Sequence, residues 1–401
     1  MDTKQAGGIP SLSPKKREKN MLIAVIGGKL QGVEVVYLAR KAGWKTLVID
    51  KNPDAPAARL CDHFLEYKFS LDHPIPRDCP EVDFILPAIE DTEVLTAIDT
   101  WSKVKNIPLA FDLNAYQTSC SKLKSNALFT KMNLPLPGTW PDCSFPVVAK
   151  PDEASGSHGV EVFNDSKAFS ARFPDRQKLG NRVVQEYITG PSYSIEVVGG
   201  PGNYLALQVT DLSMDKTFDC KRITAPTTLS FHKIDQFKEM ALALAREIKL
   251  TGIMDVEVIL NNNELKLLEI DARFPSQTPM TVLWSTGINM VEQLGNLLLG
   301  KRMADPKMNE AQFVIVEHLF VSGSDMEILG EHIMSLDGPL TLETDFFGCN
   351  EAITSYTPGK NRWVATMIFF AKSQNEVNAR RRNCYEQISK RFGLKFKEQL
   401  D

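Results

Sequence analysis

The chain has 401 residues, of which 43% are hydrophobic and 24% are charged, so it can bury a large core and divide into about two to four domains. Its formal net charge of −4 gives no electrostatic reason to expect a nucleic acid as a partner. No apolar run approaches the roughly 20 residues that cross a bilayer, so we expect no membrane partner and a cytoplasmic location.

The cysteines and the amino terminus add two further expectations. Seven cysteines are dispersed along the chain without a C-x-x-C pair, which favours free thiols in a reducing compartment and argues against a zinc site. Residues 1–20 are polar and rich in proline, glycine and lysine, which is typical of a disordered leader or an added tag.

Residues 21–115 are predicted to form a first α/β domain. An apolar run, a glycine turn and an amphipathic helix that stops at Gly43 are typical of the start of a doubly wound parallel sheet. Strands are expected at 22–28, 44–50, 82–90 and 107–111, with helices at 29–43 and 92–104.

The glycine turn of this domain has two interpretations. Asp50 closes the second strand about 20 residues further on, where the ribose-binding acid of a dinucleotide site would lie. However, Gly27, Gly28 and Gly32 form G-G-x-x-x-G, which fits the G-x-G-x-x-G spacing of such a site poorly. The alternative is a tight turn that binds no ligand.

Residues 116–310 are predicted to form a central domain, and 311–401 a small α+β unit. A short strand carrying Lys150 leads into a loop of small residues between Gly156 and Gly159. This loop could bring backbone N–H groups close to phosphate oxygens, but it is no Walker A motif and can equally be a structural hairpin loop. The other expected elements are helices at 119–133, 165–173, 233–249 and 287–300, strands at 182–188, 192–200, 204–212, 218–226, 313–321 and 362–371, and a closing helix.

The segment 252–273 is the most informative part of the chain. Two alternating apolar runs flank three asparagines at 261–263, which predicts a β-hairpin. Residues placed symmetrically about a turn are neighbours, so Glu257 and Glu269 can meet, with Asp271 on the same side. Three carboxylates suit Mg²⁺ that holds nucleotide phosphates, whereas the alternative is a solvated outer face.

The order of these features resembles that of ATP-grasp ligases. A lysine on a helix, a lysine on a strand, a Gly/Ser loop, an apolar Q-E-Y-I hinge, an amphipathic helix and an acidic hairpin ending in E-I-D-A-R follow one another. The resemblance covers nearly everything after residue 20, and it implies a Rossmann-like first domain, a two-lobed α+β ATP-grasp domain and a small carboxy-terminal unit. The segments closest to the pyrrolysine-biosynthesis ligases of this family are GGKLQG at 27–32, IDKNP at 49–53, GIMDVE at 252–257 and EIDARFPSQTP at 269–279.

This resemblance implies a site for ATP and two Mg²⁺ ions. Glu257, Glu269 and Asp271 would hold the metal, and Arg273 would neutralise charge on the transferred phosphoryl group. The residues that would contact the nucleotide are Lys29, Asp50, Lys122 or Lys124, Lys150, Ser155, Gly156, Ser157, Glu186, Tyr187 and Ile188.

Two positions depart from the wider family. The ribose is commonly held by a Glu just after the Gly-Pro turn, and here Ser192 stands there, so Glu186 or Asp50 would have to substitute. The last metal ligand is commonly Asn, and here it is Asp271, which adds negative charge and could also serve a substrate amine.

The implied reaction is amide ligation between two amino acids. The carboxylate of 3-methyl-D-ornithine, or of D-ornithine, would attack the ATP γ-phosphate, and the ε-amine of L-lysine would capture the acylphosphate. That amine is mostly protonated at neutral pH, so the site must desolvate it or accept its proton, and Asp255 and Arg273 are the catalytic candidates. Candidates for binding the two amino acids are Lys29, Leu30, Gln31, Glu90, Asp91, Asp255, Ser276 and Thr278.

Other interpretations stay open at this point. Gln31 could merely start a helix, Glu90 and Asp91 could cap one, and Asp255 could be a solvated strand residue. The same chemistry could serve another amino acid or a carboxylated purine precursor. A nucleotide- or nicotinamide-binding sensor or oxidoreductase is the candidate from a different class, and the oligomeric state is open.

Overall fold

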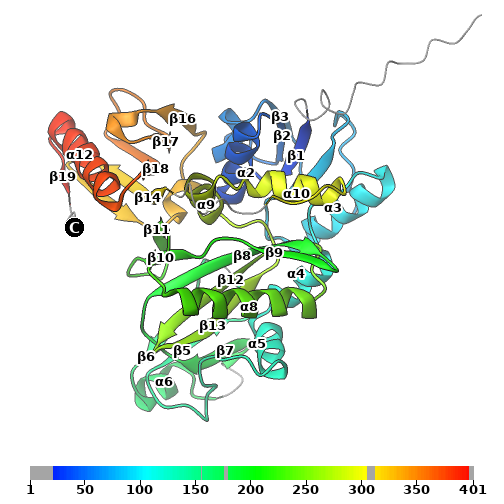
Figure 1. The fold of residues 1–401 in the computed structure, drawn as a ribbon, viewed down its shortest axis with the longest axis vertical. Coiled ribbons are helices and arrows are strands. Elements are labelled where there is room, and N and C mark those ends of the chain that lie inside the picture. Colours follow the sequence, from blue (N-terminus) through cyan, green and yellow to red (C-terminus); the bar gives the residue numbers. More distant parts are fainter. Residues whose placement is uncertain (1–20, 155, 176–178, 305–311, 397–401) are drawn as a thin grey trace, which may run out of the picture.

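The computed structural model describes residues 21–154, 156–175, 179–304 and 312–396, which form three β-sheets (Figure 1). A four-stranded sheet belongs to the amino-terminal part, a three-stranded sheet lies at the opposite end of the molecule, and a twelve-stranded sheet runs from the hairpin to the carboxy-terminal strands. The predicted leader at 1–20 and Ser155 lie outside the described residues. Within the described part, no helix has both the length and the apolar character that crossing a membrane requires.

The four-stranded sheet is parallel, with the order β3-β2-β1-β4. Strand β3 was not predicted. The strand expected at 107–111 is wrong: only an isolated parallel bridge between Ile85 and Leu109 forms there, and Pro108 cannot donate to a ladder. The elements are β1 (Leu22–Ile26), α2 (Leu30–Lys41), β2 (Lys45–Asp50), η1 (Pro56–Arg59), β3 (His63–Glu66), β4 (Phe84–Pro87) and α3 (Thr92–Lys105).

The three-stranded sheet, with the order β6-β5-β7, forms a small lobe that has its own aromatic core. Phe163 packs edge to face against Phe169 and Phe173. The helix expected at 119–133 forms as α5, which starts later because Ser121 caps its first turn, and the helix before it, α4, was not predicted. The elements of this part are α4 (Leu113–Ser119), α5 (Lys122–Lys131), β5 (Val147–Pro151), β6 (Glu161–Phe163), α6 (Ser166–Arg172) and β7 (Arg182–Glu186).

The twelve-stranded sheet has the order β13-β12-β8-β10-β11-β14-β18-β17-β16, with β9 beside β8, β15 beside β14 and β19 beside β15. Pairing of β11 with β14 makes the carboxy-terminal strands an extension of the central sheet. The strand expected at 204–212 is divided into β9 and β10. The strands are β8 (Ser192–Gly200), β9 (Asn203–Ala206), β10 (Thr210–Met214), β11 (Cys220–Ala225), β12 (Gly252–Asn261), β13 (Glu264–Asp271), β14 (Phe313–Ser322), β15 (Asp325–Leu329), β16 (Thr341–Thr344), β17 (Glu351–Thr354), β18 (Arg362–Ala371) and β19 (Lys395–Phe396).

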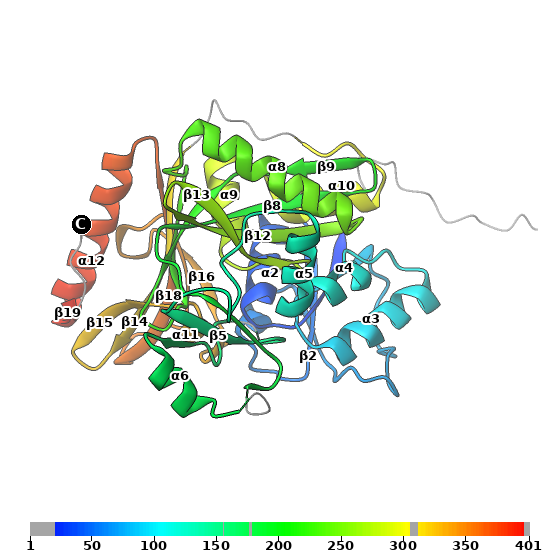
Figure 2. The same ribbon diagram turned by 90° about the horizontal axis from the view of Figure 1, so that it is seen from below.

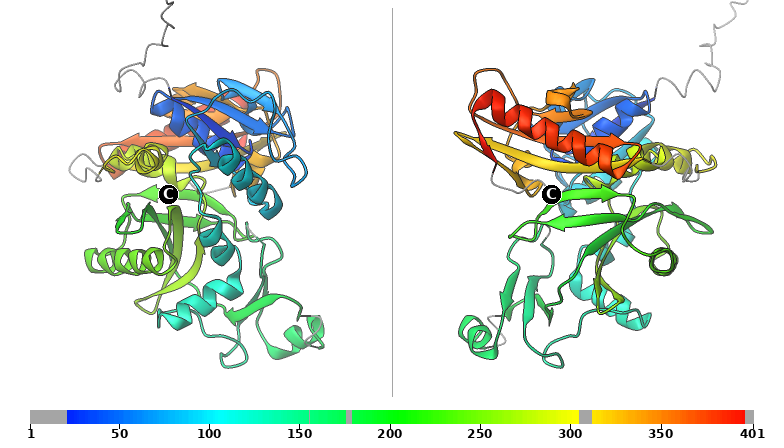
Figure 3. Two further views of the ribbon diagram at one scale, coloured as in Figure 1. Left: turned by 90° about the vertical axis from the view of Figure 1, so that its right-hand side faces the viewer. Right: turned by 60° about the vertical axis from the view of Figure 1, so that its left-hand side comes forward.

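Helices cover this sheet and join it to the first domain (Figures 2 and 3). Helix α8 packs on β8 and β9, α9 and α10 lie against α2, and α12 covers β18. Helices α9 and α11 were not predicted. The bounds are α8 (Phe231–Glu247), α9 (Thr278–Thr286), α10 (Met290–Leu298), α11 (His332–Ser335), η3 (Phe346–Gly348) and α12 (Gln374–Phe392).

Buried polar contacts fix the first domain to the rest of the molecule. Glu34 of α2 accepts a hydrogen bond from the Met280 N–H of α9 at 2.6 Å. Burial raises the pKa of Glu34 to about 8, although this backbone N–H opposes the shift. The Trp284 indole donates to the Tyr37 hydroxyl at 2.7 Å, and that hydroxyl donates to Glu351 at 2.6 Å. Helix α2 is therefore held by both α9 and β17.

The raised pKa of Glu34 predicts how stability depends on pH. The folded protein keeps the carboxyl proton until about pH 8, whereas the unfolded chain loses it near the ordinary value of 4.5, so this group's contribution to stability falls as pH rises between the two. Glu34→Gln keeps an acceptor for Met280 and never ionises. Its unfolding free energy relative to wild type should therefore increase from about pH 5 to about pH 8 by an amount on the order of a few kcal/mol. Denaturant unfolding at both pH values measures this, and an unchanged difference would contradict it.

Candidate active site

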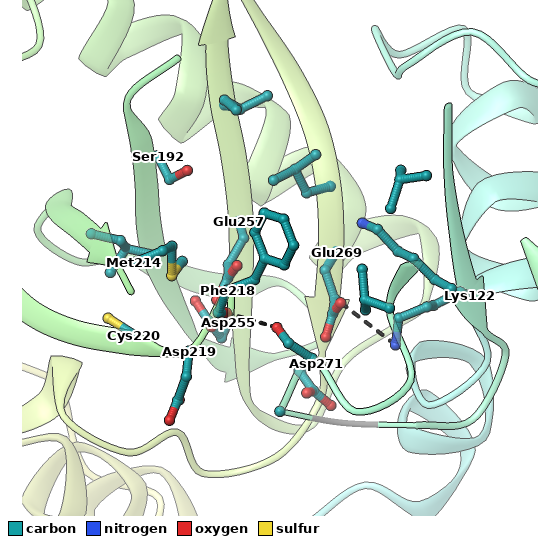
Figure 4. Close-up of a pocket in the computed structure, with 18 of the residues that line it drawn as sticks. Lys122, Ser192, Met214, Phe218, Asp219, Cys220, Asp255, Glu257, Glu269 and Asp271 are labelled. Carbon is teal, nitrogen blue, oxygen red and sulfur yellow. Dashed lines mark hydrogen bonds and ion pairs between the residues drawn. The ribbon is translucent and has the colours of Figure 1, made fainter. Parts of the chain in front are cut away.

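A cavity of about 450 Å³ lies between the small lobe and the acidic hairpin. Strands β5 and β7 line one side, and β12, β13 and residues 212–220 line the other. Figure 4 shows Glu257, Glu269 and Asp271 on the hairpin wall, with Lys122 facing them. The cavity therefore brings anionic and cationic side chains from distant parts of the sequence into one place.

Strand alternation explains the acidic wall. Alternate residues of β12 and β13 are apolar and buried in the core under α8, so the residues between them face the cavity. The predicted hairpin forms, and its register pairs Glu257 with Glu269 and Asp255 with Asp271. The two pairs make two adjacent acidic rows.

Strand β8 extends both rows. Ser194 lies opposite Glu257, and Glu196 lies opposite Asp255. Glu196 was missed in the sequence analysis. The alternation in S-Y-S-I-E would have placed Ser192, Ser194 and Glu196 on one face, but nothing in the sequence places β8 beside β12.

Two basic side chains each hold one hairpin carboxylate. Lys122 Nζ lies 3.6 Å from Glu269 Oε2 and donates to the Ala154 carbonyl at 2.7 Å. Arg273 Nη2 lies 2.8 Å from Asp271 Oδ2. Among the described residues, no three His, Cys, Asp or Glu side chains converge closely enough to hold a metal ion. The expected meeting of three carboxylates at one point is therefore not seen in this arrangement.

Burial and mutual repulsion act on the ionisation of the acidic wall. The pKa of Glu257 is held well above its ordinary range, mainly by burial and secondly by the negative charge of Asp255. Burial raises the pKa of Asp271 to about 7 against the opposing charge of Arg273, and that of Asp255 to about 6 against a hydrogen bond from Ser194. An all-oxygen donor set that carries excess negative charge fits Mg²⁺, since a hard cation would relieve the repulsion and phosphate oxygens would complete its coordination.

Lys150 projects from β5 into the cavity, beside Lys122 of α5. Burial lowers the pKa of Lys150, and the charge of Glu269 opposes that shift. Two amines that face carboxylates across a cavity form a place where phosphate oxygens would be neutralised from both sides.

The loop after β5 also lines the cavity through Gly156 and Ser157. The Ser157 hydroxyl donates to the Phe218 carbonyl on the opposite wall at 2.7 Å. The loop thus lies across the cavity, where the sequence predicted a phosphate cover.

Part of the cavity lining is apolar. It includes Ile188, Leu212, Met214 and Phe218, and Tyr187 packs edge to face against Phe218 with ring centroids 6.2 Å apart. An apolar slot beside the backbone of a connecting strand suits a flat heteroaromatic ring.

Ser192 and Glu186 both line the cavity. The Glu186 carboxylate already accepts hydrogen bonds from Lys266 and from the Gly138 N–H, each at 3.2 Å. Its predicted role at the ribose stays a prediction, and Glu186 would have to share its oxygens to fulfil it.

Gln31 and Glu90 of the first domain are connected to the cavity only indirectly, by polar contacts that lead to Arg273. Gln31 donates to Glu90 Oε1 at 2.6 Å, and the same oxygen lies 2.6 Å from Arg273 Nε. Gln31 and Glu90 therefore lie behind the arginine and do not line the cavity.

The other first-domain candidates have local structural roles or lie away from the cavity. Asp91 accepts hydrogen bonds from two backbone N–H groups at the start of α3, so its capping interpretation is confirmed. Asp50 accepts a hydrogen bond from the Gly28 N–H at 2.7 Å, which occupies it in the glycine turn. Lys29 and Leu30 begin α2 outside the cavity lining.

Comparison with known proteins agrees with this site. Residues 120–277 match the family model of the ATP-grasp domain. The 3-methyl-D-ornithine–L-lysine ligase of Methanosarcina mazei is 33% identical over 373 residues, covering 92% of this chain and 96% of that protein. The chain belongs to this family of ATP-grasp ligases. The predicted family and fold class are confirmed, and the oxidoreductase alternative loses its support.

Solved structures show the same fold at low identity. The biotin carboxylase domain of Hydrogenobacter thermophilus 2-oxoglutarate carboxylase has a TM-score of 0.67 at 14% identity, covering 91% of this chain and 89% of that one. The N5-carboxyaminoimidazole ribonucleotide synthetase of Thermus thermophilus also has a TM-score of 0.67 at 14% identity, covering 94% and 99%. The ATP-grasp arrangement therefore extends over nearly the whole chain.

The two candidate nucleotide contacts Lys150 and Asp50 are expected to behave differently. Lys150→Met removes a buried amine from the cavity and should weaken binding of ATP by about tenfold or more, because phosphate oxygens lose a charged donor. Asp50→Asn keeps an acceptor for Gly28 and should leave ATP affinity within about twofold. Calorimetric titration with ATP and Mg²⁺ measures both, and a tenfold loss in the Asp50 variant would instead support the predicted role of Asp50 as a ribose ligand.

Proposed function

We propose that the chain is an ATP-dependent, ADP-forming amide ligase of pyrrolysine biosynthesis. It would join the carboxylate of 3-methyl-D-ornithine, or of D-ornithine, to the ε-amine of L-lysine through an acylphosphate. The observation that carries the proposal is the cavity in which two lysines face an acidic wall, in a chain of the ATP-grasp ligase family. The name of the Methanosarcina mazei relative specifies both amino acids and supports this choice of substrates.

The nucleotide would lie along the cavity. Its adenine would occupy the apolar part near Ile188, and its phosphates would lie between Lys150 and Lys122 on one side and the acidic wall on the other. The Hydrogenobacter thermophilus domain was crystallised with ADP and magnesium, which supports the choice of nucleotide and metal.

Glu257, Glu269 and Asp271 are the proposed ligands of two Mg²⁺ ions. Their oxygens would share the ions with the phosphates, and Lys122 would then transfer its contact from Glu269 to a phosphate oxygen. When bound, Mg²⁺ would neutralise charge on the transferred phosphoryl group.

In the first half-reaction, a carboxylate oxygen of the ornithine substrate would attack the γ-phosphorus while the bond to the ADP oxygen breaks. Arg273 is placed to stabilise the charge that develops on the phosphoryl oxygens. Its ion pairs with Glu90 and Asp271 fix the guanidinium before the substrate arrives, so little reorganisation would be needed.

In the second half-reaction, the lysine ε-amine would attack the acyl carbon, and phosphate would leave with the C–O bonding electrons. The amine must lose protons, and Asp255 is a suitable acceptor because burial brings its pKa to about 6, closer to neutrality than an exposed aspartate. A hydrogen bond from Ser194 orients this carboxylate. Ser276 and Thr278, which also line the cavity, would contact the amino acids.

The division into domains at 21–115, 116–310 and 311–401 is part of the proposal. The first unit would present Gln31 and Glu90 toward the amino-acid side, and the second would bind the nucleotide. The boundary near 310 lies outside the described residues, and the large sheet continues beyond it through β11 and β14.

A coupled assay tests the reaction. Purified protein with ATP and Mg²⁺ should release ADP only when L-lysine and either 3-methyl-D-ornithine or D-ornithine are both present, and mass spectrometry should detect the condensed amide. Omitting each amino acid in turn is the control. No ADP with either pair, or ADP with a purine precursor or a different amino acid, would refute the proposed substrates.

Glu269→Gln tests the metal site. Loss of one anionic ligand should lower ADP formation by at least about 100-fold while thermal unfolding stays cooperative, because the side chain keeps its size. The matched control is Glu264→Gln at the exposed turn end of the same hairpin, which should retain full activity. Equal activity of both variants, or unfolding of the first alone, would favour a structural role for Glu269.

A further inference from the structure

His332, the first residue of α11, packs against the loop that follows β5. A Cβ atom built on Gly156 of this loop would lie 2.5 Å from both Cε1 and Nε2 of the imidazole ring. No side chain fits at that distance, so the loop backbone can lie against the edge of the ring because residue 156 is a glycine. The carboxy-terminal part of the chain therefore contacts the loop that lies across the cavity.

The backbone angles of this loop indicate that its contacts hold it in place. Gly156 and Ser157 have left-handed φ angles of 58° and 57°, and a serine rarely adopts that region. The Ser157 hydroxyl donates to the Phe218 carbonyl at 2.7 Å. Two successive contacts, with His332 and with Phe218, thus stabilise a backbone conformation that is unfavourable by itself.

His332 and Phe218 belong to one connected unit. The Asp219 carboxylate, directly after Phe218, accepts the backbone N–H of His332 at 3.1 Å and lies 2.8 Å from its Nδ1. The Asp215 carboxylate accepts the N–H groups of Asp219 and Gly330, each at 3.1 Å. These hydrogen bonds join the β10–β11 turn to the start of α11. The imidazole ring and the Phe218 carbonyl therefore keep a fixed position relative to each other.

Core packing does not account for His332. Its side chain is 49% exposed, whereas His318 of β14 is buried and contacts the Thr366 hydroxyl at 3.0 Å. The hydrogen bond with Asp219 raises the pKa of His332 against the opposing effect of burial, with the charges of Asp219, Glu331 and Asp215 acting in the same direction as the hydrogen bond. A half-exposed ring that a carboxylate orients toward a loop backbone is suited to holding that loop.

We propose that His332, oriented by Asp219, is a positioning residue that holds the loop at 156–159 closed over the phosphates of the bound nucleotide. This inference rests on the proposed binding of nucleotide in the cavity, and it adds that the carboxy-terminal part of the chain takes part in closure. The loop would have to leave the imidazole ring and the Phe218 carbonyl before ADP departs, so these contacts would set how fast the product is released.

The dissociation rate of Mg²⁺-bound ADP tests this role. ADP that carries a fluorescent methylanthraniloyl group is displaced from the full-length protein by excess ATP in a stopped-flow experiment. His332→Ala should speed dissociation by about fivefold, because the loop loses one of its two contacts. Asp219→Asn keeps an acceptor for the His332 N–H and should change the rate in the same direction by a smaller factor.

The matched control is His232→Ala, which removes an exposed imidazole at the start of α8 and should keep the wild-type rate. Thermal unfolding establishes that each variant is folded. An unchanged dissociation rate in a folded His332→Ala variant would overturn the proposal.

A second substitution distinguishes loop closure from a general loss of structure. Gly156→Ala places a methyl group against the imidazole ring and should speed dissociation by about tenfold or more. In the His332→Ala background the methyl group has room, so the same substitution should cost only about threefold, which is the remaining effect of the left-handed φ. Independent effects of the two substitutions would contradict a direct contact between loop and ring.

The outcome is separable from that of the proposed reaction. Wild-type protein that binds Mg²⁺-bound ADP and shows these variant effects, but forms no amide from the two amino acids, would refute the reaction and keep the closure role of His332. Failure of wild type to bind Mg²⁺-bound ADP would overturn both the proposed nucleotide site and the closure role.

Discussion

The site depends on the alternation of three adjacent strands, β8, β12 and β13. One face of these strands supplies apolar side chains to the core under α8, and the other face carries two rows of polar and acidic residues. The same hydrogen-bonded ladder that buries the apolar face thus holds the carboxylates side by side against their mutual repulsion. A shift of one residue in register would place the acidic residues in the core and the valines in the cavity.

Cations from outside this sheet compensate the repulsion. Lys122 comes from α5, Lys150 from β5 of the small lobe, and Arg273 follows β13 directly. Arg273 has a further function, since its ion pair with Glu90 ties the first domain to the acidic wall. The electrostatic balance of the cavity therefore depends on side chains from three different elements of the structure.

The sequence predicted those features that are local. Glu257 and Glu269 could be paired from the hairpin because a short turn fixes their register, and the ATP-grasp resemblance followed from motifs in their order. Glu196 could not be found, because its neighbour Asp255 lies 59 positions further along the chain and only the folded sheet brings them together. Asp50 was proposed as a ribose ligand because of its spacing after the glycine turn, and Asp91 as a substrate ligand because it follows the carboxyl end of a strand. The structure adds that oxygens of both accept backbone N–H groups. The carboxy-terminal strands were expected as a separate unit, because pairing of β11 with β14 has no local signal.

The continuity of the large sheet limits which parts of the molecule can separate when nucleotide enters or leaves. Pulling the carboxy-terminal strands away from the acidic hairpin would rupture backbone ladders along β11 and β14. Within the described residues the small lobe shares no such ladder with the large sheet, and the Ser157 hydroxyl on the Phe218 carbonyl is one of its contacts across the cavity. Opening the cavity for nucleotide exchange would therefore break the fewest backbone hydrogen bonds if the small lobe moved alone. The large sheet and its carboxylates would then keep their positions.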